Sequence, residues 1–444
     1  MTRGFRTRSL HAGVEPDPAT GARSVPIYQT TSYAFEDADA TAKRYALRAD
    51  GDVYSRISNP TASALEDRIA DLEGGTGAVA TGSGMGAFDA IVTVLASAGD
   101  NVVASAEMYG GTSTYLSTIA DRRGIEARTV ETLAYDRYAE AIDEDTAFVH
   151  VETISNPSLA TPDLERLADV AHENAVPLVV DNTFATPALC RPFEHGVDVV
   201  WESTTKWMTG NGTTVGGVVV DGGTFPWDHP DADYPELSGE NPAYGIDFSE
   251  RFGDAPLANV VRQRSLRTTG GQQSPFDAWQ TLQGLETLPI RMERHCGNAR
   301  AIAEFLREDD RVAWVSYPGF ADHETHANAD RYLDGYGGMV TFGVEGGFEA
   351  AKTLCESVEL TSFLANVGDA KSLIIHPAST THAQMDRTEQ RNAGVSPDML
   401  RLSVGLEDPA DVAADLDRGL AAGERAADSG TRGGPASPTE DRDR

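Results

Sequence analysis

The sequence predicts an α/β protein whose mainly parallel central sheet is flanked by helices and followed by a smaller C-terminal α+β domain. Three observations lead to this prediction. Short β-branched runs have the apolar character of strands that are buried on both faces of a parallel sheet. Amphipathic segments long enough for crossover helices lie between these runs. The chain also has 444 residues, of which 40% are hydrophobic, so it can bury a large core and form two packed domains.

Residues 1–60 are predicted to form an N-terminal arm. They are rich in Gly, Pro, Thr and Tyr and show little helical periodicity before DADATAKRYAL. Arms of this kind often pack on a partner subunit, so we expect this one to contact a neighbouring subunit.

Residues 61–262 are predicted to form the large α/β domain. The predicted strands are GAVATGSG, NVVAS, AFVHVET, VPLVVDNT, VDVVWEST and GGVVVDGG. The predicted helices include PTASALEDRIADLEG, MGAFDAIVTVLASAG and TPDLERLADVAHENA. Residues 224–262, rich in Pro, Asp and aromatic side chains, break the alternation and are predicted to be an insertion or irregular excursion.

Residues 263–424 are predicted to form the smaller α+β domain. TLQGLETLPIRMERHCGNARAIAEFLRED indicates a long helix, and VAWVSYPGF, GGMVTFGVEG and SLIIHP indicate strands. Residues 425–444 combine Gly, Pro, Ser and charged residues with almost no bulky apolar side chain, which predicts a disordered tail.

The charge of the chain argues against two classes of partner. Asp and Glu number 69 against 36 Lys and Arg, a formal net charge of −33, and such a surface repels nucleic acids and anionic membranes. The start, MTRGFRTRSLHAG, lacks the apolar core of a signal peptide, and no apolar stretch is long enough to span a bilayer, so we expect a cytoplasmic protein. Cys190, Cys296 and Cys355 lack metal-ligand spacing, and no metal site is predicted.

The lysine content is equally unusual. Only Lys43, Lys206, Lys352 and Lys371 occur, while acidic residues run along the whole chain. This composition resembles that of proteins from salt-loving archaea. Because self-repulsion destabilises the compact state until molar salt screens it, we expect a high-salt requirement. The alternative is an ordinary acidic cytosolic protein.

A glycine-rich turn in TGSGMGAFDAIVTVL follows a predicted strand and opens a predicted helix. Free backbone amides and the helix dipole at such a turn can hold an anion, so Ser83, Gly84 and Met85 are candidates for a phosphate site. Tight strand–helix turns also use glycine for steric reasons alone, without binding a ligand.

Asp181 ends the apolar run in VPLVVDNTF. An acidic group at the carboxyl end of a parallel strand faces the crevice where ligands bind. There it could pair with a protonated pyridine nitrogen and help the ring to accept electrons. It could equally cap a helix or contact a metal or a ribose.

Lys206 follows the next apolar run, in VDVVWESTTKWMTG, and is expected at the sheet edge beside Asp181. In a chain with almost no other lysine, a Lys between apolar and aromatic neighbours indicates a nucleophilic amine, which Arg cannot supply. Ser203 and Thr205 could donate to the same phosphate. The alternative is a surface lysine without a chemical role.

Eight motifs occur in a defined order: YSRISNPT, SGMGA, EMYGGT, ETISNP, DNTF, STTKW, HPASTTH and RLSVG. Together they resemble the cysteine/methionine metabolism family of pyridoxal phosphate enzymes, over roughly residues 8–422. The resemblance implies pyridoxal 5′-phosphate as cofactor, the fold type I architecture of such enzymes, and a homo-oligomer built as a dimer of dimers.

The resemblance also implies roles for single residues. Lys206 would carry the cofactor as a Schiff base, Asp181 would pair with its pyridine nitrogen, and Tyr109 would stack on its ring. The residues implied at the phosphate are Gly84, Met85, Ser203 and Thr205, together with Tyr54 and Arg56 of the neighbouring subunit.

Three further residues are implied around the substrate. Asn156 would lie near the phenolic oxygen of the cofactor. Arg401 would bind the α-carboxylate of the substrate, because a planar guanidinium can contact both oxygens. Asn366, in ANVGDAKS, would support that carboxylate contact.

Within this family, NVGDAKSLIIHPASTTH and the insertion containing YPELSGENPAYG most resemble members that act on O-acetylhomoserine. The implied reaction is γ-replacement, in which sulfide or methanethiol displaces acetate to give homocysteine or methionine. Lys206 would be the general base, and Tyr109 would assist the leaving group as an acid or base.

Three alternatives stay open from the sequence. One is a cystathionine γ-synthase, which uses cysteine as the thiol, and another is a γ-lyase. Methionine γ-lyases carry a cysteine where Gly111 stands here, which disfavours the lyase. The third is a non-enzymatic phosphate-binding α/β protein, which would leave HPASTTH and RLSVG unexplained.

Overall fold

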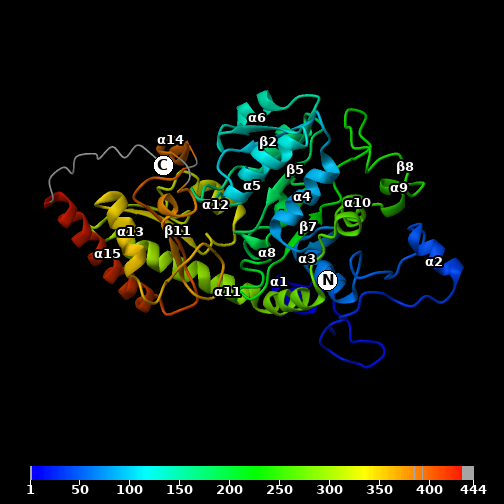
Figure 1. The fold of residues 1–444 in the computed structure, drawn as a ribbon, viewed down its shortest axis with the longest axis horizontal. Coiled ribbons are helices and arrows are strands. Elements are labelled where there is room, and N and C mark those ends of the chain that lie inside the picture. Colours follow the sequence, from blue (N-terminus) through cyan, green and yellow to red (C-terminus); the bar gives the residue numbers. More distant parts are fainter. Residues whose placement is uncertain (1–2, 384–385, 393, 433–444) are drawn as a thin grey trace, which may run out of the picture.

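The computed structural model describes residues 3–383, 386–392 and 394–432. Figure 1 shows a larger part around one sheet and a smaller part around a second sheet, with the long helix α11 running beside both. The larger sheet has seven strands in the order β1-β7-β6-β5-β4-β2-β3. These strands are β1 (Gly77–Thr81), β2 (Asn101–Ser105), β3 (Glu126–Val130), β4 (Thr146–Glu152), β5 (Leu178–Asp181), β6 (Val199–Glu202) and β7 (Gly217–Asp221).

The larger sheet is mainly parallel, which confirms the predicted fold class. Strands β3, β2, β4, β5 and β6 run parallel, whereas β7 pairs antiparallel with both β6 and β1. All six apolar runs form strands of this sheet. Strand β3 was not predicted, because it lies at the sheet edge and its sequence, EARTV, is half exposed and partly charged.

Two hydrophobic cores cover the two faces of this sheet. Neighbouring residues along a strand point to opposite faces, so Val149 and Val180 join one core while Phe148 and Val179 join the other. The helices and helical turns of this part are α3 (Pro60–Glu73), α4 (Gly84–Leu95), α5 (Gly110–Thr114), the π-helix 115–120, α6 (Tyr135–Ala141), α7 (Leu164–His172), α8 (Thr186–Leu189) and the 3₁₀ turn 192–195.

The N-terminal segment begins with α1 (Phe5–His11), a helix that the sequence did not predict, which packs against α3 and α11. The helical stretch expected in DADATAKRYAL is α2 (Ala38–Tyr45), which is capped by the Asp37 side chain. In Figure 1 the segment that carries α2 extends away from the body of the subunit. An extended segment of this kind exposes its side chains to other molecules.

Residues 224–262 pack against the larger sheet. Trp227 and Tyr234 are buried, and the Tyr234 hydroxyl donates a hydrogen bond of 2.8 Å to the Ala147 carbonyl at the start of β4. The segment contains β8 (Glu240–Asn241), β9 (Ile246–Asp247), α9 (Phe248–Phe252) and α10 (Pro256–Val261), and the π-helix 262–269 follows.

The smaller part is an α+β unit, as predicted, with a five-stranded sheet in the order β10-β11-β14-β13-β12. Its strands are β10 (Val312–Ser316), β11 (Met339–Val344), β12 (Ser362–Phe363), β13 (Leu373–Ile375) and β14 (Met399–Ser403). Its helical elements are α11 (Pro275–Arg307), α12 (His326–Tyr332), α13 (Gly347–Ser357), the 3₁₀ turn 377–379, α14 (Arg387–Asn392) and α15 (Pro409–Arg432).

Helix α15 runs into the segment that was expected to be a disordered tail. The residues from 425 to 432 continue this helix, and Ala427 packs against the core of the smaller part. The helix continues because alanines keep an apolar stripe facing that core. Residues 433–444 lie outside the described part of the chain. Within the described ranges, no helix has both the length and the apolar character needed to cross a membrane.

Candidate active site

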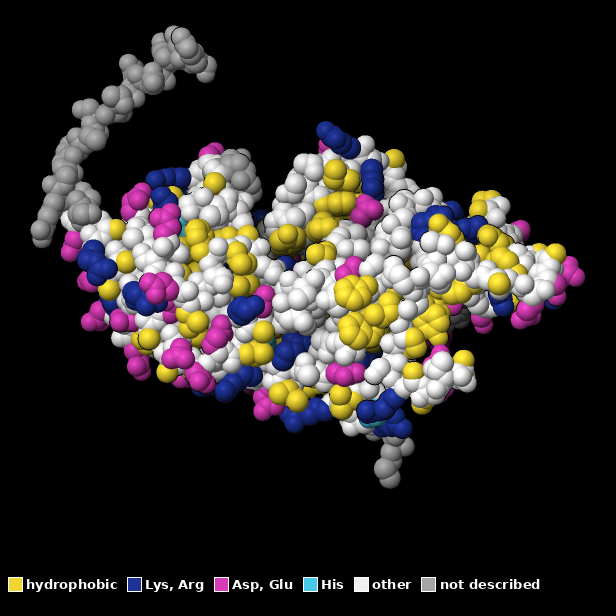
Figure 2. Space-filling view, turned by 60° about the horizontal axis from the view of Figure 1, so that its bottom comes forward, with side chains coloured by type: hydrophobic (Ala, Val, Ile, Leu, Met, Phe, Trp, Pro, Cys, Tyr) yellow, Lys and Arg dark blue, Asp and Glu magenta, His cyan; other side chains and the backbone are white. Residues whose placement is uncertain are grey.

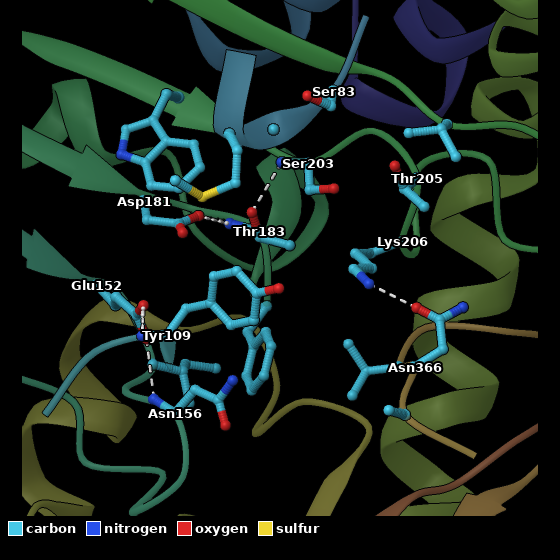
Figure 3. Close-up of a pocket in the computed structure, with 18 of the residues that line it drawn as sticks. Ser83, Tyr109, Glu152, Asn156, Asp181, Thr183, Ser203, Thr205, Lys206 and Asn366 are labelled. Atoms are coloured by element: carbon cyan, nitrogen blue, oxygen red, sulfur yellow. Dashed lines mark hydrogen bonds between the residues drawn. The ribbon is translucent and has the colours of Figure 1, made fainter. Parts of the chain in front are cut away.

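A cavity of about 250 Å³ lies at the carboxyl ends of the parallel strands (Figure 3). This is the sheet edge at which α/β proteins bind ligands. All but two of the residues predicted for the site line it. These are Ser83, Gly84, Met85, Tyr109, Asn156, Asp181, Ser203, Thr205, Lys206, Asn366 and Arg401.

One end of the cavity is built to receive an anion. Helix α4 starts at Gly84, and the Ser83 hydroxyl caps it by accepting a hydrogen bond of 3.0 Å from the Gly86 N–H. A Cβ atom at Gly84 would lie 2.7 Å from the Cβ of Ser203, so only glycine lets the two loops approach this closely. Helix-terminal amides and the Ser203 hydroxyl thus face one space, which suits a phosphate.

Thr205 lies in the same loop, but its hydroxyl is already engaged. It donates to the Gly216 carbonyl at 3.1 Å and lies 3.0 Å from the Gly216 N–H, from which it accepts. Its contact with a phosphate therefore remains a prediction that requires this pairing to be shared or exchanged.

Asp181 supplies a carboxylate beside the cavity. It is the last residue of β5, is 7% exposed, and accepts a hydrogen bond of 2.9 Å from the Thr183 N–H. Burial raises the pKa of its carboxyl, while Thr183 and the Lys206 ammonium act in the opposite direction. A buried carboxylate that faces a cavity is most stable next to a cation, and a protonated pyridine nitrogen is one.

Lys206 supplies an amine on the other side of the cavity. Its Nζ donates a hydrogen bond of 2.5 Å to the Oδ1 of Asn366. Burial and the neighbouring Arg401 together lower the pKa of Lys206 to about 8, while Asp181 opposes the shift. A larger neutral fraction near pH 7 makes this amine a better nucleophile and base than an exposed lysine.

Arg401 brings a positive charge from β14 of the smaller part. Its guanidinium donates to the Asn156 Oδ1 at 3.0 Å, and burial lowers its pKa to about 10. Among the described residues, no carboxylate forms an ion pair with Arg401. A guanidinium that is charged at neutral pH and lacks an acidic partner is suited to an anionic group of a ligand.

Tyr54 and Arg56 are the two predicted residues that do not line the cavity. The Arg56 guanidinium lies 5.4 Å from the centre of the Tyr54 ring and donates to the Arg267 carbonyl. Tyr54 is 40% exposed. A single subunit therefore does not bring these two residues to the site, and their predicted contact from a neighbouring subunit stays a prediction.

Glu152, Thr183 and Trp201 also line the cavity and were not predicted from the sequence. Glu152 ends the apolar strand TAFVHVE in the same way that Asp181 ends LVVD, so the argument used for Asp181 would have found it. The Trp201 indole donates to the His150 Nε2 at 3.2 Å. Burial lowers the pKa of His150 to about 3, so this histidine is a neutral acceptor.

Two further buried carboxyl groups, Glu73 and Glu202, lie close to each other behind the cavity. The Asn182 amide donates to one oxygen of Glu73 at 2.9 Å. The other oxygen of Glu73 and both oxygens of Glu202 receive no hydrogen bond from any described residue. Burial raises the pKa of both carboxyls, and the two lie within hydrogen-bonding reach of each other. A proton held between them supplies the missing donor.

We expect the Glu202→Gln variant to be more stable than the wild type above about pH 6, since an amide replaces the shared proton. A carboxyl whose folded-state pKa is raised binds its proton more tightly in the folded protein than in the unfolded chain. Stability therefore falls as the pH rises above the unfolded value of about 4.3, by up to about 1.4 kcal/mol per pH unit for one proton. Unfolding midpoints between pH 5 and 9 in molar salt measure this slope.

The Glu202→Leu variant is the control for that experiment, because it removes the charge but offers Glu73 no donor. We expect it to be less stable than Glu202→Gln at every pH. Equal pH slopes for the wild type and Glu202→Gln would show that the pair holds no proton of its own.

No group of three or more His, Cys, Asp or Glu side chains within the described ranges is placed to hold a metal ion. Cys190 and Cys355 are buried and Cys296 is half-buried, and all three are free thiols. The amine, carboxylate and guanidinium of the cavity, together with its anion site at the start of α4, fit pyridoxal phosphate.

Comparison with known proteins supports this reading along almost the whole chain. Residues 6–421 match the family model described as Cys/Met metabolism PLP-dependent enzyme. The chain is 47% identical to homocysteine synthase from Schizosaccharomyces pombe over 419 residues, which are 94% of this chain and 98% of that protein. It is also 47% identical to O-acetyl-L-homoserine sulfhydrylase 1 from Thermus thermophilus over 421 residues, or 94% of this chain and 100% of the relative.

Solved structures agree with the sequence relatives. An O-acetylhomoserine (thiol)-lyase from Campylobacter jejuni, which carries N′-pyridoxyl-lysine-5′-monophosphate, matches with a TM-score of 0.90 and 38% identity over 94% of this chain and all of that one. The metB protein of Corynebacterium glutamicum matches with a TM-score of 0.81 and 35% identity over 95% and 98%. These matches confirm the predicted family, cofactor and fold type, and the chain belongs to the Cys/Met metabolism family of pyridoxal phosphate-dependent enzymes.

Proposed function

We propose that this enzyme replaces the γ-acetyl group of O-acetylhomoserine with sulfide, giving homocysteine and acetate. The observation that carries the proposal is the convergence of Lys206, Asp181 and Arg401 on one cavity at the sheet edge. Relatives named homocysteine synthase and O-acetyl-L-homoserine sulfhydrylase, aligned over nearly the whole of both chains, support this substrate. Methanethiol in place of sulfide would give methionine.

The proposed cofactor contacts follow from the two ends of the cavity. The start of α4 and the Ser203 hydroxyl hold the phosphate, while Asp181 holds the ring nitrogen in its protonated form. When bound, pyridoxal phosphate withdraws electrons from the Cα and Cβ bonds of the substrate. Asn156, on the side of Arg401, is proposed to lie near the phenolic oxygen.

Lys206 is the proposed proton carrier at Cα. Its lowered pKa, about 8, leaves an appreciable neutral fraction that can accept a proton near neutral pH. Arg401 is proposed to bind the α-carboxylate, which would fix the Cα–H bond near that amine. Asn366 already holds the Lys206 Nζ at 2.5 Å, so it can orient the amine while Arg401 orients the substrate.

Tyr109 is the proposed proton donor or acceptor for the leaving acetate. Figure 3 shows its ring projecting into the cavity between Asp181 and Asn156. A Cβ atom at Gly111 would collide with this ring, so the absence of a side chain at Gly111 gives the ring its position. This contact favours γ-replacement over the γ-lyase alternative, because methionine γ-lyases carry a cysteine at the position of Gly111.

We also propose a homo-oligomer, built as a dimer of dimers, in which Tyr54 and Arg56 complete the neighbouring subunit's phosphate site. Neither residue lines the cavity of its own subunit, and the segment that carries them lies beside the extended α2. Figure 2 shows hydrophobic side chains gathered near the middle of one face, with many acidic ones toward its ends. Val215 (57% exposed), Phe276 (51%) and Ile290 (67%) are exposed apolar residues that a partner could cover.

We also propose a cytoplasmic location and a requirement for high salt, and the net charge of −33 supports the salt requirement. Carboxylates spread along the whole chain repel one another in dilute buffer, and concentrated salt removes this repulsion. An enzyme of this composition is suited to a concentrated ionic interior.

Product analysis in molar salt tests the reaction. The purified holoenzyme is given O-acetylhomoserine with sulfide, methanethiol or cysteine in turn, and we expect homocysteine from sulfide at the highest rate. Cystathionine as the main product would assign a cystathionine γ-synthase, and 2-oxobutyrate without any thioether would assign a γ-lyase. A colourless protein that takes up no cofactor in any salt would leave only a phosphate-binding protein.

A further inference from the structure

We propose that Glu152 is a positioning residue, which holds two of the segments lining the cavity by their backbone N–H groups. It does not itself transfer a proton. The inference rests on the proposed roles of Tyr109, Asn156 and Arg401, and it adds the residue that keeps these three in a fixed relation.

The Glu152 carboxyl group binds the N–H groups of Tyr109 and Asn156 together, and we call this arrangement the clamp. Glu152 is the last residue of β4, is 4% exposed, and lines the cavity. One oxygen accepts a hydrogen bond of 2.6 Å from the Tyr109 N–H, and the other accepts one of 2.8 Å from the Asn156 N–H. Figure 3 shows both bonds leaving the same carboxyl group. Because both oxygens are occupied, the group is placed to hold other residues.

The clamp extends to the smaller part of the molecule. The Asn156 side chain, whose backbone Glu152 holds, accepts the hydrogen bond from the Arg401 guanidinium at 3.0 Å. The Glu152 carboxyl group therefore positions the backbone of Tyr109. Through Asn156 it also positions the Arg401 guanidinium, which is proposed to bind the substrate. A shift of either segment would change the distance between the Tyr109 ring and the site proposed at Arg401 for the substrate carboxylate.

A second buried carboxyl group lies next to Glu152. Glu152 is the register partner of Asp181 on the adjacent strand, so two carboxyl groups end neighbouring strands. Burial and Asp181 raise the pKa of Glu152 well above its ordinary range, and the hydrogen bonds from the Tyr109 and Asn156 N–H groups oppose this shift. Two converging N–H donors require two acceptor oxygens, which a carboxyl group provides and an amide does not.

The test compares Glu152→Gln with Asp221→Asn. Asp221 is a matched control: it ends β7, is 1% exposed, and accepts from the Gly223 and Ala258 N–H groups at 3.0 and 3.1 Å. Because β7 is antiparallel to β6, its carboxyl end lies at the sheet edge opposite the cavity. Both variants thus put an amide in place of a buried carboxylate that accepts two backbone N–H groups.

Three readouts are taken on the full chain in molar salt: the KM for O-acetylhomoserine, the dissociation constant of pyridoxal phosphate, and hydrogen exchange at the Tyr109 and Asn156 amides. For Glu152→Gln we expect KM and the dissociation constant to rise roughly tenfold or more, with faster exchange at one of the two amides. For Asp221→Asn we expect KM and the dissociation constant within about twofold of the wild type, although its unfolding midpoint falls.

Cofactor binding and amide exchange need no substrate, so they test the clamp even if the enzyme does not form homocysteine. Values within twofold of the wild type for Glu152→Gln, or equal effects in Asp221→Asn, would overturn the inference. If Glu152→Gln does not fold, Glu152→Asp keeps the carboxyl group but retracts both oxygens, and we expect the same changes. If neither Glu152 variant folds while Asp221→Asn does, Glu152 serves folding and not the positioning of the site.

Discussion

The Lys206→Arg variant is expected to lose at least about 10³-fold in kcat for homocysteine formation, because a guanidinium is neither a nucleophile nor a base near neutral pH. Arg keeps the positive charge beside Asp181, so the fold and the unfolding midpoint should change little. Rates with O-acetylhomoserine and sulfide measure the loss. Borohydride reduction of the wild-type holoenzyme, followed by peptide mapping, should find the cofactor on the peptide that contains Lys206.

Lys352→Arg is the matched control, since it is the same substitution on the surface of α13, where the Lys352 Nζ lies 3.8 Å from the Glu356 Oε1. It should keep wild-type rates. A Lys206→Arg enzyme that retains more than a few per cent of the activity, or cofactor attached to another lysine, would remove Lys206 from its proposed role.

The same variant can test the oligomer. If Arg56 completes the neighbouring site, the Arg56→Ala variant should have low catalytic activity when it is assayed on its own. Refolding it together with Lys206→Arg should restore activity in about a quarter of the sites, since half of the random dimers are mixed and each has one intact site. No recovery on mixing would place Arg56 in its own subunit's site or in none.

The sequence revealed the central strands because those strands are buried on both faces and read as uninterrupted apolar runs. Strand β3 escaped because an edge strand can carry charged residues such as Glu126 and Arg128. The direction of β7 was also hidden, since an apolar run does not tell its direction. The connection from β6 offered a signal: STTKWMTGNGTTVG has no helical pattern, and a parallel crossover would need one.

The site shows the same division. Asp181 was predicted from its place at the end of a strand, and Lys206 from the scarcity of lysine in the chain. Both signals are local in the sequence. The contact between Arg401 and Asn156 joins residues 245 positions apart, so only the motif resemblance placed them together. Glu152 has a local signal but no obvious chemical role until its two N–H partners are seen. The helix that extends α15 past residue 425 depended on packing against the smaller core, which composition alone does not reveal.

Lowering KCl from about 2 M to about 0.1 M is expected to unfold or dissociate the enzyme and abolish its activity. The chain carries a formal charge of −33, and the Debye length lengthens from about 3 Å at 1 M salt to about 10 Å at 0.1 M, so repulsion between carboxylates acts over a longer range. Circular dichroism, sedimentation and initial rates, measured against KCl, should change together and recover when salt is restored.

Two experiments distinguish the screening of acidic charge by KCl from a general stabilisation of the compact state. Asp39, Glu140, Glu173 and Glu308 are exposed, and none has an ion pair within the described part of the chain. Replacing these four by Asn or Gln should shift the transition to lower KCl, because less repulsion then needs screening. Sucrose, which stabilises compact states without screening charge, should replace KCl poorly. If sucrose protects as well as KCl, or if the four-site variant keeps the wild-type midpoint, the salt requirement reflects weak burial of apolar surface and not the acidic charge.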